Sequence, residues 1–115
     1  HRPTVVAYSH YAGKALEFFN RNSTCTPCIA PNFDHTPRSG FRGHLLQGST
    51  PGKWGKLCRM TRDYILHNDA IDDLLFIKSW NEWGEGNYLE PDRRWGKAYI
   101  EETARVLVAE KVKDK

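Results

Sequence analysis

The chain has 115 residues, of which 39% are hydrophobic and 12% aromatic, so it has the composition of a globular protein and enough length for one hydrophobic core. Its formal net charge is only +3 and its 17 Lys and Arg residues are spread along the sequence, so we expect no nucleic-acid partner. No apolar run approaches the roughly 20 residues of a membrane-spanning helix, so we also expect no membrane span.

The first half of the chain predicts a strand, a helix, a second strand and a loop. The β-branched run at residues 4–8 is typical of a strand, and apolar residues at helical spacing follow from an N-cap at Ser9 until two asparagines break the pattern. Residues 27–33 are a second short apolar run, strand-like but interrupted by a proline. Residues 34–49 are polar and contain several glycines, which predicts a loop.

The second half predicts two helices on either side of a buried strand. Ser49 or Thr50 is a suitable N-cap, and Pro51 fits the first helical turn. One face of this helix collects Trp54, Leu57, Cys58, Thr61 and Ile65. Residues 74–80 form a nearly continuous apolar run, the pattern of a parallel strand buried on both faces. A last amphipathic helix is marked by Tyr99, Ile100, Thr103, Val106 and Leu107.

The cysteines and histidines give little indication of a metal site. Cys25 and Cys28 form a CxxC pair, but a zinc site needs a second pair of ligands and none follows in the sequence. We expect ordinary reduced thiols, which fits a cytoplasmic protein. A metal-dependent phosphoesterase is an alternative that would use Asp34, His35 and His44, although one Asp–His pair without a second cluster indicates little. We therefore predict neither a metal nor another cofactor.

Strand, helix, strand, helix, strand, helix is the order of a parallel α/β architecture. Three such units are too few for a closed (β/α)8 barrel, which takes about 250 residues, and a free-standing sheet of three strands leaves two long apolar edges. We expect residues 1–115 to be the C-terminal part of a single TIM-like (β/α)8 barrel domain, with the remainder of the barrel upstream of residue 1. In barrels the chemistry lies where strands pass into loops.

The stretch SWNEWGEGNYLEPD, residues 79–92, follows the last predicted strand and gathers carboxylates. On an extended strand Glu82 and Glu85 would point to opposite faces, because side chains alternate. Gly84 and Gly86 permit a tight turn that brings both to the same side. Two carboxylates that face one cleft repel each other, which raises the pKa of one and leaves an acid beside a base. That pairing breaks and makes glycosidic bonds.

The same stretch is rich in aromatic residues. Trp80, Trp83 and Tyr88 offer flat apolar faces with polar edges, which suit the C–H faces of a sugar ring. The expected partner is therefore a carbohydrate substrate, or a sugar donor and acceptor. A structural alternative stays open, in which the indoles belong to the core and the glutamates cap backbone amides.

Three motifs stand in order along the chain: PNFDHTPRSG, then GSTPGKWGKL, then FIKSWNEWGEGNYLEPDRRWGKAYIE. They resemble, in that order and spacing, the Trp-Asp-Asn-Thr-Pro-Arg segment, the Ser-Thr-Pro helix start and the closing motif of the WbsX-like glycosyltransferase family. This family is associated with lipopolysaccharide and O-antigen synthesis and is similar in fold to the endo-α-mannosidases of glycoside hydrolase family 99. The resemblance implies a glycan-active enzyme and the last third of a (β/α)8 barrel.

The resemblance also implies roles for the two glutamates. In the mannosidases an Asn-Glu-Trp-X-Glu segment holds both catalytic carboxylates, and residues 81–85 match it. By that analogy Glu82 is the base that takes the proton of a sugar 2-hydroxyl, and Glu85 first protonates the departing oxygen and then activates the acceptor. Another sugar as acceptor gives transfer, and water gives hydrolysis by a retaining, endo-acting enzyme. A non-catalytic sugar-binding or structural segment is the further alternative.

Other polar and aromatic positions of these motifs are expected to contact substrate. They are Trp80, Asn81, Trp83, Tyr88, Glu90, Asp34 and Arg38. The chain departs from the pattern where Trp-Asp-Asn reads Phe33-Asp34-His35, and where Gly84 replaces the His of the mannosidases. For the first of these loops, a structural ion pair between Asp34 and Arg38 is the alternative to ligand contact.

Overall fold

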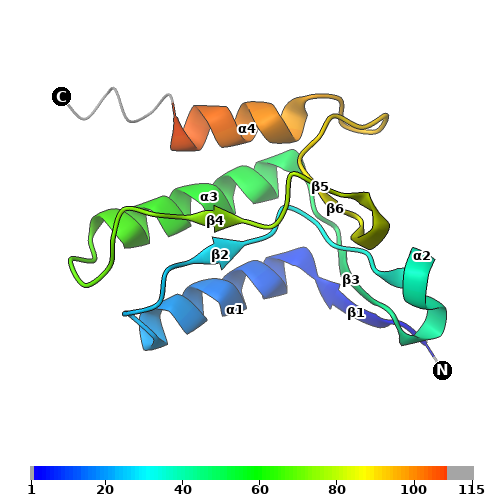
Figure 1. Cartoon of the computed structure of the whole chain (residues 1–115), viewed down its shortest axis with the longest axis horizontal. Helices are drawn as coiled ribbons and strands as arrows, with labels where there is room; N and C mark the ends of the chain where they lie inside the picture. Colours follow the sequence, from blue (N-terminus) through cyan, green and yellow to red (C-terminus); the bar gives the residue numbers. More distant parts are fainter. Residues whose placement is uncertain (1, 109–115) are drawn as a thin grey trace.

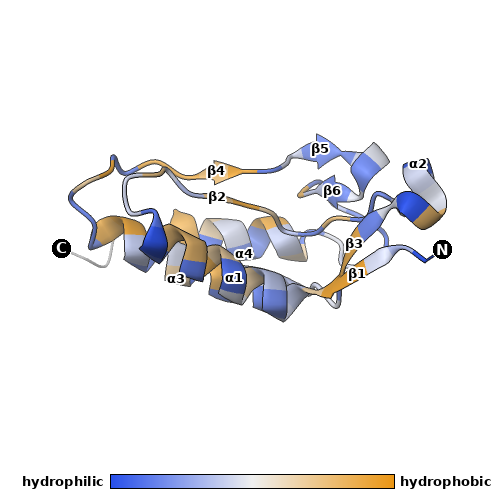
Figure 2. Cartoon of the chain, turned by 90° about the horizontal axis from the view of Figure 1, so that it is seen from below, coloured by the Kyte–Doolittle hydropathy of each residue, from blue (hydrophilic) through white to orange (hydrophobic). Residues whose placement is uncertain are grey.

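Short strands alternate with helices along residues 2–108, which are the residues that this computed structural model describes. α3 lies between α4 and α1, and β2 and β4 form a second layer on one side of these helices (Figures 1 and 2). In chain order the elements are β1 Thr4–Ala7, α1 Tyr8–Arg21, β2 Cys28–Ile29, α2 Thr36–Ser39, η1 Gly40–Arg42, β3 His44–Gln47, α3 Pro51–Leu66, β4 Phe76–Ile77, β5 Asn81–Glu82, η2 Trp83–Glu85, β6 Asn87–Tyr88 and α4 Ala98–Leu107.

The strands form three separate pairs. β1 pairs in parallel with β3, with Thr4 opposite His44, and β2 pairs in parallel with β4, with Cys28 opposite Phe76. β5 and β6 form an antiparallel hairpin. Two parallel pairs connected through helices agree with the predicted alternation of strands and helices. The closed barrel stays a prediction.

The prediction of one loop over residues 34–49 is wrong, because this segment contains α2, η1 and the strand β3. In β3, Leu45 and Leu46 lie opposite Val5 and Val6 of β1. The run HLLQ has only two apolar residues, so its strand character comes from pairing with β1 rather than from a periodicity of its own.

The predicted helix near the N-terminus is present but begins before its expected cap. α1 starts at Tyr8, and its N-cap residue Ala7 makes no side-chain capping bond. The Tyr8 side chain is fully buried, and its hydroxyl donates to the Ala30 carbonyl over 2.7 Å. This tertiary contact, rather than a cap at Ser9, fixes the start of the helix. The strand predicted at residues 27–33 is also shorter than expected, since β2 covers only its second and third residues.

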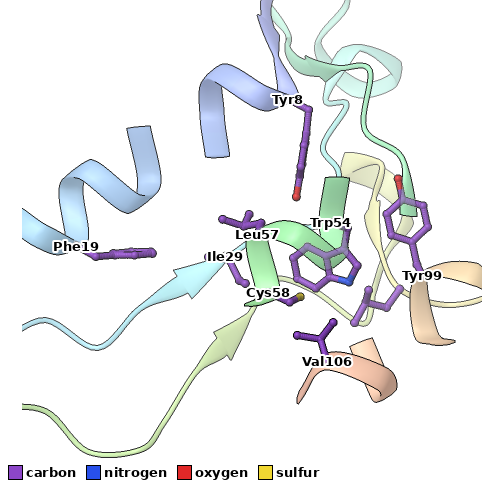
Figure 3. Close-up of a cluster of buried hydrophobic side chains, with 9 residues drawn as sticks. Tyr8, Phe19, Ile29, Trp54, Leu57, Cys58, Tyr99 and Val106 are labelled. Carbon is purple, nitrogen blue, oxygen red and sulfur yellow. The ribbon is translucent and has the colours of Figure 1, made fainter. Parts of the chain in front are cut away.

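α3 is the central helix, and its predicted start is confirmed. The Thr50 hydroxyl accepts a bond from the Lys53 N–H over 3.2 Å, and Pro51 occupies the first turn. The predicted buried face is confirmed too, and Trp54 within it donates through Nε1 to the Thr103 hydroxyl of α4 over 2.8 Å. Figure 3 shows this face at the middle of the core, which collects Tyr8, Phe19, Ile29, Trp54, Leu57, Cys58, Leu89, Tyr99 and Val106.

The strand predicted to be buried on both faces is partly buried on one face and exposed on the other. β4 covers only the middle of residues 74–80, and Leu75 and Ile77 pack against the core. The alternate side chains point away from it, since Leu74 is 48%, Phe76 55% and Trp80 53% exposed. Figure 2 shows helices on one side of this layer only. A parallel strand with an open apolar face supports the proposal that further barrel elements cover it. None of the described helices has the length and apolarity to cross a membrane.

Residues 1–115 expressed alone are expected to self-associate and to bind hydrophobic dyes through the open face of β4. Phe76→Ser should reduce both effects clearly. Phe18→Ser is the matched control, because Phe18 is also 55% exposed but lies on α1. Light scattering and dye fluorescence measure the difference. A monodisperse monomer that unfolds cooperatively would contradict the partial-barrel proposal.

Candidate functional site

A hairpin directly after β4 carries most of the predicted site residues. β5 and β6 are its strands, and the 3-10 turn η2 joins them. Gly86 closes the turn in a left-handed conformation (φ 53°, ψ 36°), and its N–H donates to the Trp83 carbonyl over 3.0 Å. The tight turn predicted from the two glycines is therefore confirmed, with Gly86 and not Gly84 at positive φ.

Gly86 also allows the hairpin to approach the loop at Asp34. A Cβ atom at position 86 would lie 2.9 Å from the Asp34 backbone nitrogen and 3.0 Å from its carbonyl oxygen. The Asp34 N–H donates to the Glu85 carbonyl over 2.7 Å. A side chain at position 86 is thus excluded both by the backbone conformation and by this close contact.

The buried side chain of Asn87 ties the hairpin to the rest of the chain. Its amide donates to the carbonyls of Asn32, over 2.6 Å, and Lys78, over 2.7 Å. The Asn32 side chain in turn accepts from the Tyr88 N–H over 2.8 Å and donates to the Tyr88 carbonyl over 3.2 Å. Leaving such buried groups unpaired costs about 1–3 kcal/mol each, so this network fixes the place of the hairpin.

Arg38 lies between the two predicted catalytic carboxylates. Its Nη2 is 3.8 Å from Glu82 Oε1 and its Nη1 is 3.9 Å from Glu85 Oε2. Both glutamates therefore reach the same side of the hairpin. Arg38 Nη2 lies where a Cβ atom at position 84 would be, so a side chain there would require the guanidinium to shift. The guanidinium fills the space that a side chain at position 84 would need.

Lys78 makes a closer contact with Glu85. Its ammonium donates to Glu85 Oε1 over 2.8 Å and to Asn87 Oδ1 over 3.2 Å. This hydrogen bond lowers the pKa of Glu85, with help from the charges of Lys78, His35 and Arg38, although partial desolvation acts against it. The expectation that carboxylate repulsion raises a pKa is therefore wrong for Glu85, because the hydrogen bond from Lys78 and the neighbouring positive charges lower it.

Two aromatic rings of the hairpin stack on each other. The rings of Trp83 and Tyr88 are 3.7 Å apart between centroids and nearly parallel, at 15°. Trp83 Nε1 donates to Glu90 over 2.7 Å, and the Tyr88 hydroxyl donates to Asp92 over 2.8 Å. Burial, followed by the Asp92 hydrogen bond and charge, raises the pKa of Tyr88 to about 12, so its hydroxyl stays protonated at neutral pH.

Three predicted site residues, at the base and in the turn of the hairpin, are exposed to solvent. Asn81 is exposed, and so are 53% of Trp80 and 47% of Trp83. The Trp80 carbonyl accepts bonds from the N–H groups of Leu89 and Glu90, which holds its backbone in place. The alternative in which these indoles belong to the core is therefore wrong. Trp80 keeps an accessible ring surface for a ligand.

Asp34 orders its own loop instead of pairing with Arg38. Its Oδ1 accepts from the N–H of Thr36 over 2.9 Å and from the Thr36 hydroxyl. Among residues 2–108, the ion pairs of Arg38 are those with Glu82 and Glu85, so the alternative of an Asp34–Arg38 ion pair is wrong.

A cavity of about 570 Å³ lies between this loop, the end of β3, the start of α3 and the segment before α4. We call it the Tyr88–Arg94 cavity after two residues that line it. Of the predicted site residues, Asp34 and Tyr88 line it, together with Gly86. Glu82 and Glu85 do not line this cavity. They form ion pairs with Arg38 and Lys78 instead.

The metal alternative receives no support from the part of the chain that the structure describes. Within it, no three His, Cys, Asp or Glu side chains are grouped to hold a metal ion. His35 instead forms a hydrogen bond with the Ser39 hydroxyl, 3.1 Å from its Nδ1. Cys25 and Cys28 are free, exposed thiols, and the buried Cys58 is a free thiol whose pKa burial raises to about 12.

Three residues that organise the site were not predicted: Lys78, Asn87 and Asn32. Lys78 interrupts the apolar run at residues 74–80. A charged residue in such a run indicates a specific partner, because burying an unpaired charge is costly. Asn87 follows the glycine that closes the turn. A turn between two short extended segments indicates a hairpin, and in this hairpin position 87 lies opposite position 82. No sequence pattern indicates the contact between Asn32 and Tyr88, 56 residues apart.

A family model described as Glycosyltransferase WbsX matches residues 1–103. The chain is also 32% identical, over 88 residues, to "Uncharacterized protein WxcX" of Xanthomonas campestris pv. campestris strain B100 and equally to that of strain ATCC 33913. The matched segment covers 76% of this chain and 13% of each relative, so the chain spans only a small part of their length. No solved structure matches the chain.

Replacing Lys78 by Met is expected to destabilise the fold more at neutral pH than in acid, because the bond to Asn87 is lost at every pH and the bond to ionised Glu85 only at neutral pH. The lowered pKa of Glu85 means that the stabilisation is present above the ordinary pKa of glutamate and is lost as the pH falls through the lowered value. Urea unfolding of both forms between pH 7 and pH 2 measures it. Lys56→Met, at an exposed lysine, is the control. A difference that does not depend on pH would contradict the assignment.

Gly86→Ala is expected to destabilise the protein more than Gly96→Ala. Both glycines have a positive φ, 53° and 59°, so each alanine carries a similar conformational cost of about 1–2 kcal/mol. Only position 86 also lies against Asp34, whereas a Cβ at position 96 meets nothing within 4 Å. Free energies of unfolding of the two variants test this, and equal losses would show that the Asp34 contact is unimportant.

Proposed function

The chain belongs to the WbsX glycosyltransferase family, and on that premise we propose that it contributes the acidic site of an enzyme that makes glycosidic bonds with Glu82 and Glu85. The proposed setting is the synthesis of lipopolysaccharide, O-antigen or a related polysaccharide. The observation that carries the proposal is the cluster in which both glutamates reach the guanidinium of Arg38.

The position of the cluster supports this proposal. Glu82 and Glu85 lie on a hairpin just beyond the C-terminal end of a parallel strand, which is where barrel enzymes carry their chemistry. The hairpin is held by Asn87 and by the close contact at Gly86, so the carboxylates sit on a rigid support.

The ionised state of Glu85 favours transfer over hydrolysis. A glycosidic oxygen leaves as an alcohol and needs a proton, which a carboxylate held by Lys78 and Arg38 is poorly able to supply. A donor that carries a phosphate leaving group departs without a proton. We therefore propose an activated sugar donor, for which Glu85 is needed only as a base.

In the proposed reaction Glu82 takes the proton of the donor 2-hydroxyl, and that oxygen bonds to the anomeric carbon while the leaving group departs with its electron pair. Glu85 then takes the proton of an acceptor hydroxyl, whose oxygen bonds to the anomeric carbon. The 2-oxygen leaves that carbon and regains its proton from Glu82. Arg38, which contacts both carboxylates, keeps the two negative charges close together.

A structural role without catalysis is the second candidate, and the same cluster favours it. Ion pairs to Arg38 and Lys78 satisfy both glutamates, as they would in a surface salt-bridge network. An endo-acting hydrolase is a third reading, and it requires that Glu85 be released from Lys78 and protonated before it can act as the acid.

Glu82→Gln and Glu85→Gln in the full-length protein are each expected to slow transfer from an activated donor by about 10²-fold or more, the scale of losing a positioned base. The amide keeps the size of the side chain, so a loss reports on proton transfer. Added azide should restore turnover in Glu85→Gln only, because it attacks the anomeric carbon without first losing a proton.

The matched control is Glu101→Gln, which removes an exposed carboxylate on α4. If the Glu82 and Glu85 variants both keep near wild-type turnover and unchanged stability, the catalytic proposal is excluded and the structural role is the one that stays. Hydrolysis of simple glycosides by the wild-type protein would indicate the hydrolase. In that case Glu85→Gln should lose this hydrolysis but still hydrolyse donors whose leaving group needs no proton.

A further inference from the structure

The Tyr88–Arg94 cavity has the size of a ligand site, and its volume of about 570 Å³ falls within the roughly 300–1,000 Å³ of small-molecule pockets. We propose that it binds a neutral pyranose ring, the sugar unit next to the one on which Glu82 and Glu85 act. This inference rests on the proposed function for its place in the reaction, but the binding itself is measurable without turnover.

Aromatic rings supply the apolar part of the cavity. Tyr88 and Trp95 both line it. Trp83, which is not part of the lining, stacks on the Tyr88 ring and holds it in place. Trp95 is held edge-on to Tyr99, at 78°, with centroids 6.4 Å apart. Fixed rings of this kind pack against the C–H faces of a pyranose at little entropic cost.

Polar groups around these rings have unused hydrogen-bonding capacity. Asp34 Oδ2 has no hydrogen-bond partner among the described residues, since Thr36 bonds to Oδ1. Asp92 Oδ2 accepts a bond from the Tyr88 hydroxyl, and Asp92 Oδ1 accepts one from the backbone N–H of Trp95. Each oxygen retains a lone pair for a further bond. Arg94 lies 4.9 Å over the centre of the Trp95 ring, and within residues 2–108 it pairs with no carboxylate.

The charges of the lining favour a neutral ligand over an anion. The lining includes two aspartates, Asp34 and Asp92, and one arginine, Arg94. A phosphate or a sugar acid would meet more negative than positive charge. Sugar hydroxyls can both donate to the carboxylates and accept from the guanidinium, so they match every charged group in the lining.

The cavity adjoins the glutamates through a single residue. Gly86 lines the cavity and directly follows Glu85 in the chain. Asp34 lines it as well, and its N–H donates to the Glu85 carbonyl. The hairpin β5–β6 and the segment before α4, which supply residues of both places, lie towards the same end of the molecule (Figure 1). A ring in the cavity is therefore a neighbour of a ring at the glutamates.

The test is equilibrium binding of simple sugars to the full-length protein. The probes are the methyl α-pyranosides of mannose, glucose, galactose and rhamnose, observed by saturation-transfer NMR, with inorganic phosphate and glucuronic acid as anionic probes. At least one neutral probe is expected to bind, and Arg94→Ala is expected to weaken it by about tenfold, the effect of losing a hydrogen bond to a charged group. Arg93→Ala is the matched control, because Arg93 is an exposed neighbour outside the lining.

Asp34→Asn should weaken the same probe while keeping the Thr36 bond, and Glu85→Gln should leave its affinity unchanged. The proposal is overturned if no neutral pyranoside binds, if Arg93→Ala and Arg94→Ala weaken binding equally, or if phosphate or glucuronic acid displaces the sugar. Binding that depends on Arg94, together with full turnover in the Gln variants of Glu82 and Glu85, would remove the proposed catalytic role and keep the sugar site.

Discussion

The buried amide of Asn87 is the interaction on which the arrangement of the site depends. It bonds to backbone carbonyls on both sides of the hairpin base, at Asn32 and Lys78, and these lie 55 and 9 residues away in the sequence. Because a buried amide without partners is costly, the hairpin has one position relative to the strands. That position brings Glu85 to Lys78 and Gly86 to Asp34. Both the acidic cluster and the Tyr88–Arg94 cavity follow from it.

Around that fixed hairpin, the cations decide what the two glutamates can do. Lys78 and Arg38 both contact Glu85, whereas Glu82 has an ion pair only with Arg38 among the described residues. An acid and a base are distinguished by such differences in environment. Here the difference favours Glu85 as an anion, which fits a family of glycosyltransferases better than hydrolysis of an unactivated glycoside. The same cations would also stabilise a cluster with a purely structural role. Glu→Gln variants separate the two roles, because they keep the size of the side chain and remove its charge.

The sequence indicated those features that depend on local chemistry. Thr50 and Pro51 mark the start of α3, the apolar spacing marks its buried face, and Gly86 marks the tight turn. What it did not indicate depends on partners far along the chain. Leu45 and Leu46 are a strand because β1 lies beside them. The pKa of Glu85 is lowered because Lys78, which directly follows β4, and Arg38, on the distant helix α2, both reach it. Periodicity carries no information about such contacts.

Covalent labelling with an electrophilic sugar analogue, such as an epoxyalkyl glycoside, tests the central claim most directly. Trypsin cleavage after Lys78 and Arg93 releases residues 79–93 as one peptide that holds Glu82 and Glu85. The account predicts that, in the full-length protein, the label adds to one of these two carboxylates, and that a natural acceptor glycan protects it. Label on carboxylates elsewhere, with residues 79–93 unmodified, would contradict the claim that this hairpin carries the chemistry.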